Sequence, residues 1–244
     1  ASKPLCLCPP NDRFRRGFSV ARDIFTRYAM HHRKRQVRKS PAGAKRAENR
    51  AYVTEDGMAA AELVELWRGG LLESTHRGHV VICDEKGEVV QAWGDPERVI
   101  FPRSSCKMLQ ALPLLESGAA EAAGLTDAHI ALSCASHQGA ALHVNMANRW
   151  LADLGLGEAD LRCGAHEPYD RAERDRLITG HEAPCQLHNN CSGKHSGFLT
   201  TTRHLKAGPE YVELDHPLQK AIKAATEEVT GEASAGYGID GCSA

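Results

Sequence analysis

A serine and a lysine stand three residues apart in the stretch FPRSSCKMLQAL, residues 101–112, and this stretch constrains the fold more than any other. Pro102 suits the first turn of a helix, where a missing N–H costs nothing. Apolar residues then recur at helical spacing on one face, at Met108, Leu109, Leu112 and Leu115. We therefore predict a buried helix that begins at Ser104, kinks or stops at Pro113 and ends by Gly118.

The same spacing points to a chemical role. Residues i and i+3 are neighbours on the first turn of a helix, so Ser104 and Lys107 can share a face at the positive end of the helix dipole. Burial and the helix terminus favour the neutral amine, which can take the proton of a serine hydroxyl. Ser-x-x-Lys is the motif of β-lactamases and penicillin-binding proteins. Alone it is weak, because most isolated matches are helix caps followed by an exposed lysine.

Charge divides the chain near residue 57. Residues 1–57 carry 14 Lys and Arg against 5 Asp and Glu, a balance of +9, while residues 58–244 carry 16 against 26, a balance of −10. We interpret 1–57 as a disordered basic extension outside the fold, either a leader or upstream sequence read through by mistake. Residues 58–244 then form the folded part. Nucleic-acid binding by the basic run 31–39 is the weaker alternative, because no fold pattern accompanies it.

The remaining composition is that of a globular protein, with 42% hydrophobic and 25% charged residues. No run approaches the roughly 20 apolar residues of a membrane span, and no apolar block forms a signal peptide, so we expect a cytoplasmic protein. The nine cysteines follow no framework spacing. We therefore expect reduced thiols, some of them available as metal ligands.

Strand and helix signals follow one another along residues 58–244. Three stretches have the pattern of strands, and the last two are joined by a hairpin turn at 84–87, which predicts an antiparallel sheet: 64–67, 78–84 and 87–94. Helices are predicted over 140–154 and, on an exposed face, over 171–180. A last helix has Asp215 as its cap, Pro217 in its first turn and a stop at Gly231.

A second stretch with many polar and ligand side chains is CQLHNNCSGKHSG, residues 185–197. A P-loop is excluded, because His188 stands where that motif requires glycine and His195 follows Lys194 in place of Ser or Thr. Thiolates and imidazoles are the usual ligands of zinc, and Cys191 can be joined by the distant Cys242. The alternative is a polar loop with incidental buried thiols.

Five stretches taken together resemble the type III L-asparaginases, the Rhizobium-type family whose fold is related to serine β-lactamases. They occur in this order: PRSSCKMLQALPLLESGAA, LSCASHQG, CGAHEPYD, HNNCSGKHSGFL and GIDGCS. The resemblance covers roughly residues 62–244, and five ordered motifs are far more specific than Ser-x-x-Lys alone. It implies an α/β (α+β) fold of the serine β-lactamase type, in which helices flank an antiparallel sheet beside a helical subdomain.

The resemblance also implies site residues. Ser104 would be the nucleophile and Lys107 its partner, while Ser136 would belong to a second serine–lysine pair. Zinc would be held by Cys191, Lys194 and Cys242, with Asp240 close by in the substrate site. Lysine binds zinc only as the neutral amine, so such a site should weaken at low pH. The family further implies a homodimer and L-asparagine as the substrate.

The sequence departs from the family at its end. The lysine that partners the second serine lies well downstream in these enzymes, and this sequence stops at Ala244 directly after GIDGCS. No K-T-G-like sequence, the third mark of the β-lactamase arrangement, is found in these 244 residues. We therefore expect a C-terminally truncated fragment of the family domain, whose own activity is doubtful.

The resulting hypothesis is an amidohydrolase that converts L-asparagine to L-aspartate and ammonia through a serine acyl-enzyme. Arg103 can clamp the substrate carboxylate, although an arginine before a cap is as often a surface ion-pair partner. One rival is a β-lactamase-like or peptidase-like serine acyl hydrolase with the same Ser-Lys pair. The other is a zinc or nucleic-acid binding module without enzymatic activity, built on residues 185–195 and the basic extension.

Overall fold

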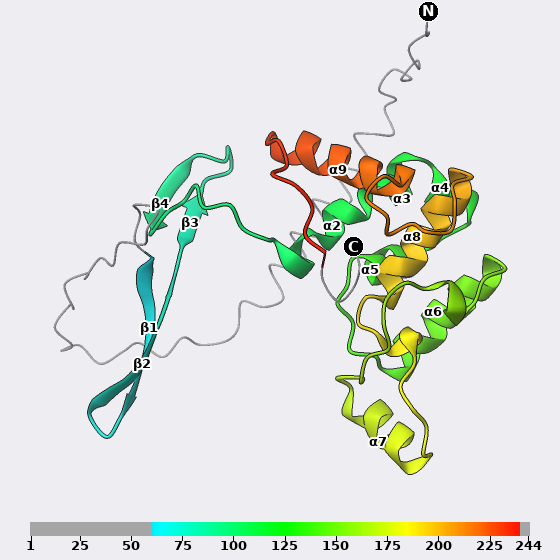
Figure 1. Ribbon diagram of the computed structural model, residues 1–244, viewed down its shortest axis with the longest axis horizontal. Helices are drawn as coiled ribbons and strands as arrows, with labels where there is room; N and C mark the ends of the chain where they lie inside the picture. Colours follow the sequence, from blue (N-terminus) through cyan, green and yellow to red (C-terminus); the bar gives the residue numbers. More distant parts are fainter. Residues whose placement is uncertain (1–59, 240–244) are drawn as a thin grey trace, which may run out of the picture. The chain divides into compact units, whose positions relative to one another are not determined.

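The computed structural model describes residues 60–239, which divide into two compact units, one ending at Pro96 and the other beginning at Glu97. The predicted extension 1–57 lies outside the described residues, as do Asp240 and Cys242. Strands occur in the first unit and helices in the second (Figure 1). Small antiparallel sheets together with helices confirm the α+β class.

The first unit contains two antiparallel hairpins. Strand β1 (Ala61–Arg68) pairs with β2 (Leu71–Gly78), and β3 (Val80–Cys83) pairs with β4 (Val89–Trp93). The predicted strand 64–67 and the predicted hairpin after residue 78 are confirmed. The sequence does not predict β2, because LLESTHRG lacks the alternation of apolar and polar residues that marks a half-buried strand.

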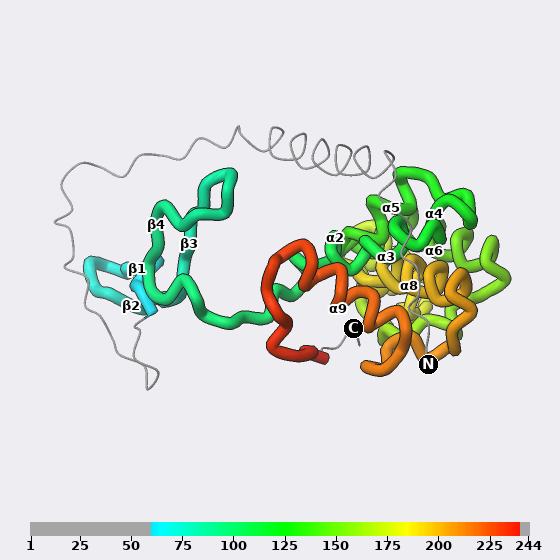
Figure 2. The backbone as a smooth tube through the Cα atoms, turned by 90° about the horizontal axis from the view of Figure 1, so that it is seen from above, coloured from blue at the N-terminus to red at the C-terminus, as the bar shows by residue number. Residues whose placement is uncertain are grey.

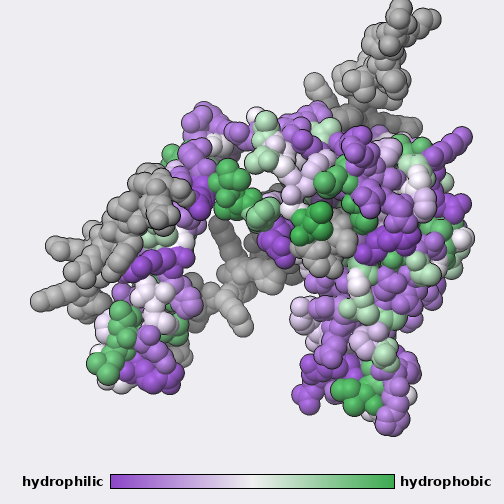
Figure 3. Space-filling model, viewed as in Figure 1, coloured by the Kyte–Doolittle hydropathy of each residue, from purple (hydrophilic) through white to green (hydrophobic). Residues whose placement is uncertain are grey.

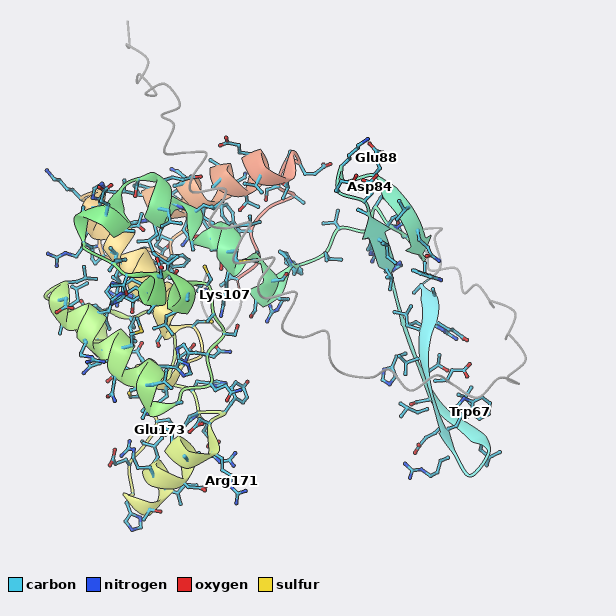
Figure 4. All side chains as sticks on the ribbon, turned by 180° about the vertical axis from the view of Figure 1, so that it is seen from behind. Trp67, Asp84, Glu88, Lys107, Arg171 and Glu173 are labelled. Atoms are coloured by element: carbon cyan, nitrogen blue, oxygen red, sulfur yellow. The ribbon has the colours of Figure 1, made fainter. Side chains whose placement is uncertain are left out.

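Each hairpin is closed by residues suited to a tight turn. Gly69 and Gly70 join β1 to β2 with φ angles of 56° and 82°, which two-residue hairpin loops require and glycine adopts without strain. Between β3 and β4, the carboxylate of Asp84 accepts the N–H of Lys86 at 2.8 Å and that of Glu88 at 3.0 Å (Figure 4). Local hydrogen bonds therefore account for both turns.

The strands do not build a core of their own. Among the described residues of this unit, 60–96, none is buried. Figure 3 shows apolar side chains on the surface at the turn of the β1–β2 hairpin, where Trp67, Leu71 and Leu72 are exposed. The buried core of the described chain therefore lies in the helical unit. An isolated two-stranded hairpin is only marginally stable in water, so the two hairpins contribute little stability by themselves.

The predicted helix from Ser104 forms as three short pieces. A 3₁₀ turn, η1 (Arg103–Cys106), leads into α2 (Lys107–Gln110), and α3 (Leu112–Glu116) follows with Pro113 in its first turn. The predicted interruption near Pro113 is confirmed as a break at Ala111 between α2 and α3, since proline cannot donate to the preceding turn, and the predicted end by Gly118 is also confirmed. The chain then turns at Gly118, which has φ 80°.

The buried face of these pieces differs from the predicted one. The sequence places Met108 and Leu115 on the buried face, but both are about half exposed. The buried residues are Lys107, Ala111, Pro113 and Leu114, and three of them, Lys107, Ala111 and Leu114, recur at i, i+4 and i+7. The prediction of the apolar face was wrong for Met108 and Leu115, because Lys107 is turned toward the rest of the unit in their place, whereas Leu109 and Leu112 are half-buried.

The other helices of this unit follow in chain order: α4 (Ala119–Ala122), α5 (Asp127–Ser133), α6 (Ala141–Asp153), the 3₁₀ turn η2 (Glu158–Asp160), α7 (Arg171–Thr179), the 3₁₀ turn η3 (Gln186–His188), α8 (Ser192–His204) and α9 (Pro217–Thr230). The predicted helices corresponding to α6, α7 and α9 are confirmed. The predicted cap Asp215 is wrong by one residue, because the ring of His216 accepts the N–H of Leu218. Gly231 ends α9 with φ 71°.

Helix α8 forms the centre of the helical unit. It contacts α3, α4, α5, α6 and α9, and every residue from 192 to 202 is buried. Three of its hydroxyls are satisfied within the helix, because Ser196, Thr200 and Thr201 each donate to the carbonyl four residues earlier, whereas the buried hydroxyl of Thr202 has no hydrogen-bond partner among the described residues. A polar sequence can therefore fill a buried helix without leaving these donors unpaired.

Two hydrophobic clusters surround α8. The larger joins α5, α6, α8 and α9 around Leu151, Phe198, Tyr211 and Leu218, and the smaller joins α3, α4 and α6 around Leu114 and Trp150. Figure 2 shows α9 beside α2 and α3, which it contacts. None of the helices in residues 60–239 is long and apolar enough to cross a membrane.

Candidate active site

Lys107 is the first residue of α2, and its side chain is only 3% exposed. Its side-chain nitrogen Nζ donates to the carbonyl oxygen of Ala135 at 2.9 Å and lies 2.7 Å from the hydroxyl oxygen of Ser136. Burying a lysine is costly unless its donors find partners. The loop after α5 supplies both partners, so α2 and this loop together hold the amine in place.

The two predicted serines lie on opposite sides of this lysine in the sequence, and both are exposed. Ser104 lies in η1, where its carbonyl oxygen accepts the N–H of Lys107. Ser136 lies after the end of α5. Among the described residues, the side-chain hydrogen bond of Lys107 goes to Ser136 and not to Ser104. The sequence predicts a different, downstream lysine for Ser136, and the spacing of the residues gives no sign of this contact.

A strained backbone precedes Ser104. Arg103 is exposed and has φ 55°, a left-handed conformation that costs a residue other than glycine about 1–2 kcal/mol. Such strain persists where the surrounding structure over-determines it and is frequent at functional sites. The strain turns the chain sharply just before the predicted nucleophile, and it supports a functional role for this segment.

The second predicted cluster lies at the start of α8. Cys191 is the N-cap residue and Lys194 is in the first turn, and both side chains are buried. The Sγ atom of Cys191 lies 3.3 Å from Asn190 Oδ1, and the Nζ atom of Lys194 stands 5.3 Å from the ring centre of Phe198. Cys242, the third predicted ligand, lies outside the described residues.

The described residues supply only two of the three predicted zinc ligands. Within 60–239, no group of three or more His, Cys, Asp and Glu side chains is arranged to hold a metal ion. A position over an aromatic ring favours the charged ammonium of Lys194, whereas zinc requires the neutral amine. Nearby, burial and the neighbouring Cys191 raise the pKa of the Cys163 thiol to about 12, which opposes a third thiolate ligand there.

Three histidines of this region are buried and hydrogen-bonded. None of them is among the site residues predicted from the sequence, although His188 and His195 lie in the stretch 185–197 that was expected to supply ligands. His137 follows Ser136 directly, and its ring bonds to Ser192 at the start of α8. His195 bonds to the hydroxyl of Tyr211 at 2.8 Å. His188 lies 3.3 Å from the buried carboxylate of Glu173. Only the position of His137 beside a predicted site residue could have drawn attention to it.

The last described residues approach the segment before Ser104. A Cβ atom on Gly238 would lie 2.6 Å from the ring of Phe101, so only glycine fits there without a shift. This contact brings the start of the GIDG sequence beside the chain that leads into η1. Asp240 itself lies outside the described residues.

Comparison with known proteins identifies a family for this chain. The family model of L-asparaginase II matches residues 64–244, well over half of the chain. A comparison with curated proteins gives no match. The family match includes every one of the motifs that surround Lys107, Ser136 and the start of α8. The chain therefore belongs to the L-asparaginase II family.

Proposed function

We propose that this chain carries the serine–lysine site of an amidohydrolase that converts L-asparagine to L-aspartate and ammonia. Membership of the L-asparaginase II family supports the reaction. The contact between the buried Lys107 and Ser136, 2.7 Å from Nζ to Oγ, carries the proposal. A buried amine bonded to an exposed hydroxyl is an arrangement that can transfer protons.

In the proposed mechanism, Ser104 Oγ bonds to the side-chain amide carbon of asparagine. Lys107, as the neutral amine, takes the hydroxyl proton and gives it to the departing nitrogen, so that the C–N bond breaks and ammonia leaves. Water then attacks the aspartyl ester, and Ser136 relays a proton between that water and Lys107. The ester opens, and the proton returns to Ser104 Oγ.

Electrostatic assistance is part of the same proposal. Backbone N–H groups at the start of α2 would stabilise the oxyanion, and one such donor is worth about 3 kcal/mol in comparable sites. Arg103 and Asp240 would bind the polar ends of the substrate. Zinc held by Cys191, Lys194 and Cys242 would orient the substrate, and zinc content lost in Cys191→Ala but kept in Cys134→Ala would support this ligand set.

Finer assignments also belong to the proposal. The order of the five motifs supports the type III branch, and the Ser-x-x-Lys turn at the start of a helix supports the serine β-lactamase type of fold. The homodimer implied by the family resemblance remains a prediction.

The test is ammonia release from L-asparagine by the whole chain and four variants: Ser104→Ala, Lys107→Ala, Ser136→Ala and, as a matched control, Ser105→Ala. Ser105 is also an exposed serine of η1, but its hydroxyl donates to the carbonyl of Pro102. We expect kcat to fall at least about 100-fold in the first three variants and to stay within about threefold in the control.

Two measurements identify the nucleophile and the substrate. Mass spectrometry of the quenched reaction should find one aspartyl group on the peptide that contains Ser104, and an aspartyl group on Ser136 instead would exchange the two roles. A panel of glutamine, a peptide amide and a β-lactam separates the asparaginase from the rival acyl hydrolase. Normal ammonia release by Ser104→Ala would refute the assignment of the nucleophile.

A further inference from the structure

His137 is buried directly after Ser136, and three hydrogen bonds hold it. Its ring atom Nδ1 accepts the N–H of Gly139 at 3.1 Å, and Nε2 lies 2.9 Å from Ser192 Oγ. Its own N–H donates to the carbonyl of Asn190 at 3.1 Å. His137 thus ties the loop that carries Ser136 to the first residue of α8 through its side chain and to Asn190, just before α8, through its backbone.

The hydrogen bonds fix the tautomer of the ring. A nitrogen that accepts an N–H carries no proton, so the proton of the neutral imidazole must be on Nε2 of His137. Nε2–H then donates to Ser192 Oγ, and the Ser192 hydroxyl donates to the carbonyl of Leu187 at 3.0 Å. The donors therefore run in one direction, from His137 to Ser192 and from Ser192 to Leu187. A proton on Nδ1 of His137 would break the hydrogen bond between Nδ1 and the N–H of Gly139.

The surroundings keep the ring neutral. Burial, followed by the charges of His143, Lys107 and His188, lowers the pKa of His137 to about 4. The ring of His143 stacks on it with 5.1 Å between the centroids, and Asp170 in turn acts on His143 and opposes the fall of its pKa. A neutral His137 adds no positive charge beside Lys107 at neutral pH.

The turn that delivers the N–H of Gly139 is closely packed. Gly139 has φ 69°, and a Cβ there would lie 2.9 Å from both the carbonyl oxygen of His188 and the Cβ of Pro168. The backbone that bonds to Nδ1 therefore cannot shift easily. Residues 135–140 form no helix or strand, so the position of Ser136 depends on the hydrogen bonds and packing contacts of His137 and Gly139.

We propose that His137 is a positioning residue for the reaction, whose neutral ring, bonded to Ser192 and Gly139, holds Ser136 Oγ against Lys107 Nζ. The inference rests on the proposed amidohydrolase function, and it adds a residue to which the Ser-x-x-Lys chemistry assigns no role. Loss of the link would let the exposed hydroxyl move, and a displacement of about 1 Å can cost a reaction about 100-fold in rate.

The kinetic test compares His137→Ala, Ser192→Ala and the double variant in the whole chain. Each single change should lower kcat for ammonia release about 10- to 100-fold with KM changed less than about threefold, and the double variant should be no slower than the worse single one. His137→Gln keeps a side-chain N–H donor and should lose less than His137→Ala. The matched control His204→Ala, which removes an exposed histidine at the end of α8, should stay within about threefold.

A second readout does not depend on activity. Imidazole ¹⁵N shifts in the wild-type chain should give His137 the Nε2–H tautomer at pH 7, and circular dichroism should show that each variant is folded. A cationic or Nδ1–H ring at pH 7 would overturn the proposal, as would full kcat in folded His137→Ala and Ser192→Ala. If the wild type releases no ammonia from asparagine, the proposed function fails first and the positioning role falls with it.

Discussion

Lys107 is a buried lysine whose hydrogen-bond acceptors come from a loop 28 and 29 residues further along the chain. Its burial brings no gain that an apolar side chain could not supply, because the cost of desolvating an ammonium offsets most of its hydrogen bonds. A residue of this kind is retained where its chemistry is used. Loss of the Lys107 amine should therefore affect activity more than it affects the stability of the fold.

Replacing Lys107 by methionine should lower activity without lowering the stability of the fold. Methionine is similar in length and fills irregular buried space well, so the free energy of unfolding should be unchanged or higher. The amine that moves protons is lost, so kcat for ammonia release should fall about 100-fold or more. Thermal unfolding followed by circular dichroism, together with an ammonia assay, measures both. A large loss of stability with only a small loss of activity would show that the lysine is structural.

Glu173 on α7 is a second buried charge, with a different role (Figure 4). Its Oε1 atom accepts from Arg176 Nε at 3.1 Å and Nη2 at 2.9 Å and lies 3.3 Å from His188 Nε2. The hydrogen bonds from Arg176 hold the pKa of this carboxyl below its usual range against the opposing effect of burial. The ionised form therefore stabilises the folded state above pH 4.5, and this contribution is lost as pH falls through the lowered pKa.

Glu173→Gln should lower the free energy of unfolding at pH 7 by about 1–3 kcal/mol, because it removes charge-assisted hydrogen bonds at a buried site. Urea unfolding between pH 7 and pH 3 should show the gap to the wild type closing at the acid end. Glu182→Gln is the matched control, since Glu182 bonds to the same Arg176 from an exposed position, and it should change stability by less than about 0.5 kcal/mol. A pH-independent gap would rule out the ionised carboxylate as its cause.

Local spacing predicts which residue types belong to the site but not which of them touch. Ser104, Lys107 and Ser136 could be named because they lie in short motifs. The bond between Lys107 and Ser136 joins residues 29 apart, and no sequence period records such a distance. His137 could not be predicted for the same reason, since the role proposed for it depends on a bond to Ser192, 55 residues later.

At the scale of elements, sequence patterns work where the two faces of a helix differ. The helices α6 and α9 were predictable because each has an apolar face against the core and a polar face toward water. Helix α8 has no such contrast, because all residues from 192 to 202 are buried and its sequence is rich in small and hydroxyl residues. Its position at the centre of the unit depends on close contacts that only the fold reveals.

Gly193 makes the closest of these contacts. A Cβ on Gly193 would lie 2.5 Å from Leu132 Cγ and 2.6 Å from its carbonyl oxygen, whereas a Cβ on Gly197, also in α8, would lie 3.3 Å from Leu114. Both Gly→Ala changes gain about 1 kcal/mol in helix propensity, so any difference between them reports packing. Gly193→Ala should destabilise by about 1–3 kcal/mol and Gly197→Ala by clearly less, as measured by urea unfolding. Equal effects would show that α8 can move away from α5.

At the scale of the whole molecule, burial is distributed unevenly between the two units. The buried residues of the described chain all come from the helical unit, while residues 60–96 include none. Backbone hydrogen bonds that lie under exposed side chains open by local fluctuation, and those beneath a packed core open only with global unfolding. The two units should therefore differ in protection although each has regular secondary structure.

Native-state hydrogen exchange should reveal this difference directly. Amides of α8 and of α6 should exchange slowest, at a free energy close to that of global unfolding, and amides of β1 to β4 should exchange first. The hairpins lack a buried apolar face, so their hydrogen bonds alone must resist opening, which two-stranded hairpins do poorly. Mass spectrometry of proteolytic peptides after a time course of deuteration measures both regions in one sample. Protection in β1 and β2 equal to that in α8 would mean that another surface covers the strands in solution. The hairpins would then be packed against a partner and would not be marginally stable.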